Sequence, residues 1–341
     1  MSVNRQVCFA RVPEGPVTEA CFALRDAPMP EVRDGQVLVR NLYLSCDPYM
    51  RGRMAGGSGY AAGFELGQPI PSRAVGVVVD SRHEAFHEGD FVWDFLRWEE
   101  YTLVGNPDTL RCIDPALGPI SHAISVLGMP GLTAEVGMLK IGRPQPGETV
   151  FVSAASGAVG QIAGQLARAA GARVVGSAGS DAKVDHVVRR LGFDAAFNYR
   201  TAGSLDDALL EHCPDGIDVY FDNVGGAALD AALARLNPFA RVPVCGMISQ
   251  YDGSGPGVRR LAAIVAARAT MTGFIVSDHM EDFDAFVPRM SARMRRGEVV
   301  YYEDIVDGID NAPAAFAGMM RGENLGKRLI RVAAGSAAAG T

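Results

Sequence analysis

The sequence predicts an α/β fold, in which a doubly wound parallel sheet follows a β-rich domain. Short runs rich in Val, Leu, Tyr and Phe fill residues 35–113 between Gly, Pro and Asp, which is typical of short strands. From Gly147 the pattern alternates between strand and helix, as in a parallel sheet covered by helices. With 341 residues, the chain exceeds the usual size of one hydrophobic core, so two domains are expected.

The β-rich half is expected to contain four strands separated by turn residues. They are GQVLVRNLYLSCDP, AVGVVVD, EGDFVWDF and EYTLV. The next stretch, DPALGPISHAISVLGMPGLTAEVGMLKIG, has a helical pattern that its Gly-Met-Pro-Gly sequence is expected to break.

Six strands and the helices between them are expected in the second half. The strands are GETVFVSAA, ARVVGSAG, AAFNY, IDVYFDNVGG, ARVPVCGMIS and MTGFIV. The helices are GAVGQIAGQLARAAG, DAKVDHVVRRLG, LDDALLEHC and GAALDAALARL. This βαβ order predicts a doubly wound sheet, which binds ligands at the carboxyl ends of its strands.

After Gly297 the alternation stops. PAAFAGMMRG is expected to be a helix, because Pro313 falls in its first turn and Gly322 past its end. The strand GKRLIRV is expected to return to the first domain. The predicted division is therefore 1–125, 126–297 for nucleotide binding, 298–332 for the return, and 333–341 as a flexible tail.

Composition and charge exclude several classes of protein. With 48% hydrophobic and 21% charged residues, the chain is neither disordered nor a coiled coil. A net charge of −7 argues against nucleic acid or an anionic membrane as the main partner. Six scattered cysteines without a C-x-x-C pair, and no apolar run of membrane-spanning length, predict a cytoplasmic protein with reduced thiols. The 40 glycines show no three-residue period, so turns and close approaches to a ligand should account for them.

A phosphate-binding turn is the clearest motif. The strand VFVSAA runs into Ala154-x-x-Gly157-x-x-Gly160 and then into a helix of small residues. Small residues let a pyrophosphate approach the backbone N–H groups at a helix N-terminus. With further βα units downstream, this context predicts a dinucleotide site rather than an ordinary tight turn.

The residues after the second strand favour NADP over NAD. An NAD site has an acidic residue at the tip of this strand, but residues 175–180 contain none. Lys183 follows in the first turn of the next helix, where it could contact a 2′-phosphate. The alternative is a solvated helix lysine, and Asp181 is expected to serve as an N-cap carboxylate.

No metal site is expected. Two-domain chains of this order include zinc alcohol dehydrogenases, and Cys46 in LSCDP is a plausible loop position for a zinc ligand. However, no Gly-His-Glu follows 20 to 25 residues on, and no four cysteines cluster. His83 and His87 fall in a polar loop and are expected at the surface. Cys46 is expected to pack as a small apolar side chain.

Without a metal, a hydride-transfer reaction needs hydrogen-bond donors for charge that develops on a substrate oxygen. Tyr49 and Tyr60 lie in loops of the first half, and Tyr251 follows a strand of the sheet. Tyr251 is the best placed, because strand ends face the ligand crevice. The alternative for each tyrosine is a packed, half-exposed aromatic side chain.

Motifs along nearly the whole chain resemble one family. They are LSCDPYMRGRM, GMPGLTA, AASGAVGQIAGQ, VVGSAGSDAKV, LGFDAAFNY, DVYFDNVGG, CGMISQY and NAPAAFAGMMRGENLGK. They resemble the zinc-independent medium-chain dehydrogenase/reductases of the prostaglandin reductase type, which include leukotriene B4 12-hydroxydehydrogenase, alkenal double-bond reductases and curcumin reductase. The resemblance implies a Rossmann NADP-binding domain and a β-rich GroES-like domain.

The resemblance also implies an activity and a set of site residues. The activity is NADPH-dependent reduction of the C=C bond of α,β-unsaturated ketones and aldehydes, with hydride added to the β-carbon. Tyr251 would lie near the nicotinamide ribose and the substrate carbonyl, and Tyr60 would border the substrate pocket. The implied cofactor contacts are Gly157, Ala158, Val159 and Gly160 for the pyrophosphate, Lys183 and Tyr199 for the 2′-phosphate, and Asn223, Cys245, Gly246, Ile248, Ser249, Phe274, Val276 and Asn324 for the nicotinamide half.

Two departures from the family pattern leave the substrate open. Cys46 stands where LSVDP has Val, which adds a thiol with possible reactivity toward electrophiles. The loop QYDGSGPGVRRL lacks the Pro-rich stretch of mammalian relatives, so a prostaglandin or leukotriene preference does not carry over. The alternatives are an NADPH quinone reductase and a nonenzymatic NADPH-binding sensor. A homodimer joined through the edge strand MTGFIV is expected from the family.

Overall fold

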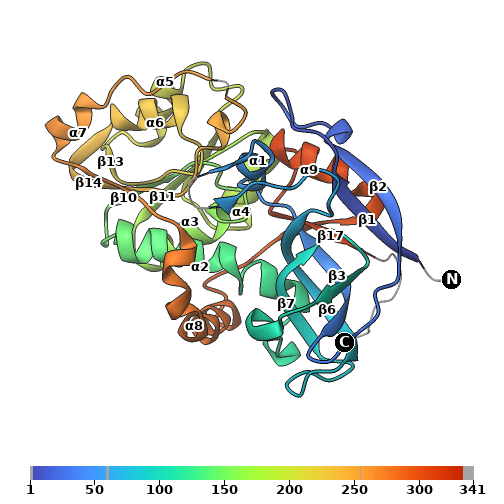
Figure 1. The fold of residues 1–341 in the computed structure, drawn as a ribbon. Helices are drawn as coiled ribbons and strands as arrows, with labels where there is room; N and C mark the ends of the chain where they lie inside the picture. Colours follow the sequence, from blue (N-terminus) through green and yellow to red (C-terminus); the bar gives the residue numbers. More distant parts are fainter. Residues whose placement is uncertain (1–2, 59–60, 254, 333–341) are drawn as a thin grey trace. The chain divides into compact units, whose positions relative to one another are not determined.

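The computed structural model describes residues 3–58, 61–253 and 255–332 and divides into two compact units (Figure 1). The first unit contains Met1–Ile124 and Glu303–Thr341, and the second contains Ser125–Tyr302. The domain limits 1–125, 126–297 and 298–332 stay predictions, and the predicted tail, 333–341, lies outside the described residues. In the part of the chain that the structure describes, no helix is long and apolar enough to cross a bilayer.

The second unit is built on a six-stranded parallel sheet with the order β12-β11-β10-β13-β14-β15. This order confirms the predicted doubly wound fold, and its direction reverses between β10 and β13. The strands are β10 (Thr149–Val152), β11 (Arg173–Ala178), β12 (Ala195–Asn198), β13 (Ile217–Phe221), β14 (Leu236–Val244) and β15 (Thr270–Gly273). Every residue of β10 is buried, as expected for a central parallel strand covered on both faces.

Helices cover both faces of this sheet. In Figure 1, α5 and α6 lie on one side of the strands, and α2 and α3 lie on the other. The α-helices of this unit are α2 (Met129–Glu135), α3 (Gly160–Ala169), α4 (Asp181–Arg189), α5 (Leu205–His212), α6 (Gly226–Leu233), α7 (Ala262–Ala267) and α8 (Phe283–Arg295). A π-helix, η5 (Val136–Gly142), follows α2, and the 3₁₀ helices are η6 (Ile248–Gln250) and η7 (Val276–Asp282).

The Gly-Met-Pro-Gly sequence was expected to break a helix, and this prediction is wrong. It begins α2, with Pro130 in the first turn, where the missing N–H of proline costs nothing. Gly131 follows because a Cβ there would overlap the carbonyl oxygen of Val126. The preceding residues form only the 3₁₀ helices η3 (Pro115–Leu117) and η4 (Ile120–Ile124).

The first unit contains a seven-stranded sheet with the order β16-β17-β3-β6-β7-β9, and β8 pairs with β3. Its strands are β3 (Val37–Ser45), β6 (Pro71–Ser81), β7 (Phe91–Arg97), β8 (Tyr101–Val104), β9 (Arg111–Cys112), β16 (Glu303–Asp307) and β17 (Lys327–Arg331). Two hairpins accompany it, β1 (Val3–Phe9) with β2 (Phe22–Pro28) and β4 (Gly57–Ser58) with β5 (Ala61–Ala62). The helices are α1 (Met50–Met54), α9 (Ala312–Met320), η1 (Glu19–Cys21), η2 (Pro107–Thr109) and η8 (Ile309–Asn311).

The predicted return of the chain to the first unit is confirmed. Strand β17 pairs antiparallel with β3, and Pro313 lies in the first turn of α9. Phe316 of α9 packs edge-on against Trp98, with ring centroids 6.0 Å apart, in the core of this unit. The β1–β2 hairpin and β16 were not predicted, because β2 is largely exposed and β16 is short and acidic at both ends.

Candidate cofactor and active site

The turn between β10 and α3 has the geometry of a phosphate-binding turn. Ala154 has a left-handed backbone with φ of 50°, which is unusual for a residue with a side chain. Its carbonyl oxygen accepts a hydrogen bond from Gly157 N at 2.9 Å. A Cβ on Gly160 would overlap this oxygen, and a Cβ on Gly157 would lie 3.1 Å from it. Gly157, Ala158, Val159 and Gly160 therefore lead into the N-terminus of α3 with little side-chain bulk, which suits an approaching pyrophosphate.

The predicted 2′-phosphate residues lie where β11 and β12 end. Ser180 caps α4, because its hydroxyl accepts from Lys183 N at 3.4 Å. Tyr199 N donates to Ala178 O at 3.1 Å, and a Cβ on Gly179 would lie 3.0 Å from the Tyr199 hydroxyl. Tyr199 thus adjoins the turn that begins the helix of Lys183. The predicted contacts of both residues with a 2′-phosphate stay predictions.

Two features of this end were not predicted. Asp181 is not the N-cap of α4, since Ser180 holds that position, and the Asp181 carboxylate instead accepts from Asn198 Nδ2 at 2.7 Å. Arg200 adds a cation beside Tyr199, with its guanidinium carbon 5.8 Å from the centre of the ring. The signal for Arg200 was its place directly after Tyr199 at a predicted strand end.

The side chain of Asn223 joins the ends of β10 and β13, where the sheet order reverses. Its Nδ2 donates to Ser153 O at 2.8 Å, and its backbone N donates to the Ser153 hydroxyl at 3.0 Å. Its carbonyl oxygen accepts from Ile248 N at 3.4 Å. Asn223 therefore connects the start of the phosphate turn to the segment that follows β14.

That segment carries Cys245, Gly246, Ile248, Ser249 and Tyr251. The Ser249 hydroxyl donates to the carbonyl oxygen of Val224 at 2.7 Å, which holds the segment beside the Asn223 turn. Burial raises the pKa of the Cys245 thiol to about 12, so this cysteine contributes a neutral thiol.

The Tyr251 side chain folds back on the segment that precedes it. Its hydroxyl oxygen accepts from Met247 N at 3.4 Å. A Cβ on Gly246 would lie 3.1 Å from this oxygen, so the glycine makes room for the phenol. The structure thus brings Tyr251 together with Gly246 at the carboxyl end of β14.

Phe274 and Val276 follow β15 and mainly pack inside the unit. The Phe274 ring meets Phe221 edge-on, with centroids 6.5 Å apart, and a Cβ on Gly137 would lie 2.6 Å from its edge. Val276 is buried. Their predicted contacts with the nicotinamide half stay predictions.

Three predicted residues belong to the first unit. Tyr49 precedes α1 and packs on the core of that unit. Asn324 lies before β17, and its Nδ2 donates to Gly326 O at 2.7 Å. Tyr60 lies outside the described residues.

A buried lysine of the first unit was missed by the sequence analysis. Lys327 is 1% exposed, and its Nζ donates to Cys46 O at 2.7 Å and contacts Asp47 Oδ1 at 2.5 Å. The Ser45 hydroxyl donates to the other carboxylate oxygen of Asp47. The lysine fixes the loop that leads to Tyr49. Its only signal in the sequence was its place in the ENLGK motif.

The donor residues do not fit a catalytic zinc. Cys46 is buried, and burial raises the pKa of its thiol to about 12, whereas zinc binds the thiolate. Its predicted packing role is confirmed, and the suggested reactivity toward electrophiles does not fit this burial. Among the described residues, no group of three His, Cys, Asp or Glu side chains could hold a metal ion.

The doubly wound sheet, the phosphate turn and the β-rich unit define a two-domain, dinucleotide-binding protein of the dehydrogenase class. Comparison with family models agrees. Residues 5–112 match the N-terminal domain of oxidoreductases, and residues 158–292 match the zinc-binding dehydrogenase domain.

Individual relatives indicate which branch of this class the chain resembles. The NADP(+)-dependent 2-alkenal reductase of Nicotiana tabacum is 42% identical, over 96% of this chain and 97% of its own length. The NADPH-dependent curcumin reductase of Escherichia coli is 39% identical, over 97% of both chains. The crystal structure of CurA from Vibrio vulnificus in complex with NADPH is 36% identical, with a TM-score of 0.91, and the match covers 97% of this chain and 100% of that one.

The chain belongs to the medium-chain dehydrogenase/reductase family, in the branch of the prostaglandin, alkenal and curcumin reductases. This membership confirms the predicted family and fold class, and it confirms that the protein is an oxidoreductase.

Proposed function

We propose that this protein is an NADPH-dependent oxidoreductase that reduces the C=C bond of α,β-unsaturated ketones and aldehydes. The tobacco and Escherichia coli relatives are named for NADP dependence and for reduction of 2-alkenals and curcumin, which are conjugated carbonyl compounds. The observation that carries the proposal is the hydrogen-bonded path from the phosphate turn at Ser153 through Asn223 to the Tyr251 segment. This path assembles cofactor and donor residues at the carboxyl edge of one sheet.

The residues present fit NADPH. The turn Gly157–Gly160 would hold the pyrophosphate, and Lys183 with Tyr199 would hold the 2′-phosphate. Asn223, Phe274, Val276, Asn324 and the segment from Cys245 to Ser249 would line the nicotinamide half. Residues 175–180, at the end of β11, contain no carboxylate to repel a 2′-phosphate, and the Asp181 carboxylate that follows is hydrogen-bonded to Asn198 Nδ2. When bound, NADPH supplies a hydride.

In the proposed reaction, hydride adds to the β-carbon of the substrate. The electron pair of the C=C bond moves to the α-carbon and the carbonyl oxygen, and a proton from solvent then adds to the α-carbon. Tyr251 donates a hydrogen bond to the oxygen while it carries the enolate charge. Tyr49 and Tyr60 are the other candidate donors.

Consumption of NADPH with a panel of conjugated carbonyls tests this function. An aliphatic enone such as 3-nonen-2-one should react faster than a naphthoquinone, with the saturated ketone as the product. Faster turnover of the quinone would favour a quinone reductase. Tight NADPH binding without turnover of either would favour a sensor.

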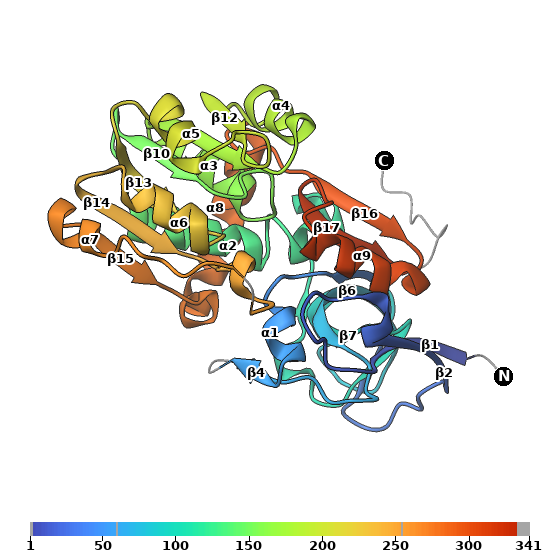
Figure 2. The same cartoon turned by 90° about the horizontal axis from the view of Figure 1, so that it is seen from above.

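The proposal includes a homodimer formed at the edge strand β15. This strand ends the sheet beside α7 (Figure 2), and apolar side chains are exposed around it. They are Phe239, Leu261, Val265 and Met271, with exposed fractions of 66%, 50%, 80% and 39%. An open edge with apolar side chains needs covering. Light scattering should give twice the chain mass, and the Val265→Arg variant should give the chain mass.

A further inference from the structure

The residue immediately after β13, Asp222, makes contacts that no cofactor role accounts for. Its side chain is fully buried, at 0% exposure. It lies between the last residue of β13 and Asn223, at the point where the sheet order reverses. We propose that Asp222 is the positioning residue that holds both segments of the nicotinamide half in one arrangement. This inference rests on the proposed use of NADPH.

The carboxylate organises the turn that contains Asn223. Its Oδ1 accepts from the Tyr220 hydroxyl at 2.6 Å, from Val224 N at 2.9 Å and from Gly225 N at 2.8 Å. Gly225 and Gly226 that follow have φ of 68° and 51°, a region that glycine tolerates best. The carboxylate thus fixes the backbone that follows Asn223, whose side chain is in turn fixed on Ser153.

The main chain of Asp222 holds the second segment. Its carbonyl oxygen accepts from Cys245 N at 2.8 Å and from Gly246 N at 3.1 Å, and its N–H donates to Pro243 O at 3.0 Å. These bonds fix the end of β14, from which the Tyr251 segment departs. A single residue therefore connects the Asn223 turn and the Cys245–Gly246 strand end.

Burial of the Asp222 carboxyl is energetically unfavourable, which argues that this residue has a role beyond packing. Burial raises the pKa of the Asp222 carboxyl, because the charged form loses its hydration. Among the described residues, its Oδ2 has no hydrogen-bond partner. A charged acceptor forms roughly twice as strong a hydrogen bond as a neutral one. Two hydroxyl groups, of Tyr220 and Ser153, and two backbone N–H groups converge on Oδ1 of this buried carboxyl, which is what a strongly held turn requires.

The test compares NADPH with adenosine 2′,5′-bisphosphate, which has the 2′-phosphate but no nicotinamide. The Asp222→Ala variant should weaken NADPH binding about tenfold or more, because the charge-assisted hydrogen bonds that hold the Asn223 turn are lost. Affinity for the bisphosphate should stay within about twofold, because among the described residues the Asp222 carboxylate reaches the start of the phosphate turn only through a long hydrogen bond, 3.4 Å, from the Ser153 hydroxyl. Asp222→Asn keeps an acceptor and should fall between wild type and alanine.

The matched control is Asp218, on the same strand at the opposite edge of the sheet. It accepts from Thr149 N at 2.8 Å and from Asn237 Nδ2 at 2.9 Å. Asp218→Ala should lower the melting temperature and leave both affinities within about twofold. A loss of affinity for both ligands with Asp222→Ala, or for neither, overturns the inference.

If Asp222→Ala does not fold, Tyr220→Phe provides the same test, since it removes one donor to Oδ1 and leaves the backbone intact. It should weaken NADPH by about threefold to tenfold and leave the bisphosphate unaffected, and equal effects on both ligands overturn the inference. A wild-type protein that binds the bisphosphate but not NADPH would contradict the proposed function instead.

Discussion

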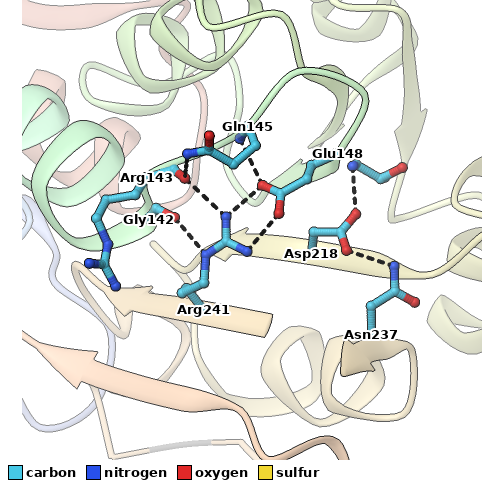
Figure 3. Close-up of polar contacts among 8 residues, drawn as sticks. Gly142, Arg143, Gln145, Glu148, Asp218, Asn237 and Arg241 are labelled. Atoms are coloured by element: carbon cyan, nitrogen blue, oxygen red, sulfur yellow. Dashed lines mark hydrogen bonds and ion pairs between the residues drawn. The ribbon is translucent and has the colours of Figure 1, made fainter. Parts of the chain in front are cut away.

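The residues at the two ends of the strands of the parallel sheet satisfy their polar groups in different ways. The amino edge is the end at which the strands begin, and the carboxyl edge is the end at which they finish. At the amino edge, Arg241 donates to both carboxylate oxygens of Glu148, at 2.8 and 2.5 Å, and to the carbonyl oxygens of Gly142 and Arg143 (Figure 3). At the carboxyl edge, Asp222 has four donors on one oxygen and none, among the described residues, on the other.

At the amino edge, hydrogen bonds from Arg241 hold the end of the π-helix η5 against the sheet. The carbonyl oxygens of Gly142 and Arg143 lie at the end of this helix, and Gln145 N adds a further hydrogen bond to Glu148 at 2.8 Å. Asp218 accepts from Thr149 N and, in the same figure, from Asn237 Nδ2. This edge therefore stabilises the fold, because removal of one member leaves buried polar groups unpaired.

The carboxyl edge instead contains glycines in tight turns that lead into the N-termini of helices. At Gly160 there is no room for a side chain, and Gly225 has a positive φ that glycine tolerates best. Backbone N–H groups at such turns bind anionic ligands. The comparison indicates that mutations at the amino edge should change stability, whereas mutations at the carboxyl edge should change binding and rate.

The largest effect is expected from Arg241→Met at the amino edge. It leaves the Glu148 carboxylate and two carbonyl groups without their donor, so unfolding in urea should show a loss of about 3 kcal/mol. NADPH affinity at a temperature where the variant is folded should not change. The control is Arg321→Met, which removes an exposed pair with Glu323 and should cost less than about 0.5 kcal/mol. A large loss of NADPH affinity with Arg241→Met would contradict the division between the edges.

The next effect concerns cofactor choice at the carboxyl edge. Lys183→Ala should weaken NADPH by about 1.5 to 3 kcal/mol, because a charge-assisted contact with the 2′-phosphate is lost. NADH, which has no 2′-phosphate, should bind as before. The control Arg189→Ala removes a cation from the last turn of the same helix and should change neither. Equal weakening of NADPH and NADH would refute the role of Lys183.

A smaller effect is expected on the rate. Tyr251→Phe should lower kcat for an enone about tenfold while NADPH affinity stays nearly constant, if the hydroxyl stabilises the developing oxygen charge. Tyr302→Phe, whose ring packs on His186 with centroids 4.3 Å apart, is the control in the same unit. An unchanged kcat with Tyr251→Phe would leave this tyrosine as a packing residue.

The smallest effect is in the pH dependence of stability. Hydrogen bonds from Arg241 lower the pKa of Glu148, so its contribution is lost as the pH falls through that lowered pKa. Burial raises the pKa of Asp222, so its folded state takes up a proton first and gains relative stability on acidification. As the pH falls toward about 4, the stability of wild type relative to Asp222→Asn should increase, and as it falls further, below about 4, the stability relative to Glu148→Gln should decrease. Urea unfolding at several pH values measures both, and the same sign for the two variants would contradict the contrast.

Local patterns were enough to predict the doubly wound fold, the phosphate turn and the place of Lys183 in the first turn of a helix. Each depends on residues close in the chain: apolar runs of strand length that alternate with helical patterns, glycines at turn spacing, and a lysine just inside a predicted helix. The family motifs added Tyr199 and Asn223, which the structure places at the ends of β12 and β13.

Tertiary structure alone decided which charges and thiols are buried, and therefore what they can do. Arg241 and Glu148 are 93 residues apart, and Lys327 and Asp47 are 280 apart, so no local pattern could pair them. The raised pKa values of the Cys46 thiol and the Asp222 carboxyl depend on removal of water by neighbouring elements, because the free energy of a charge is set by its surroundings rather than by its place in the chain.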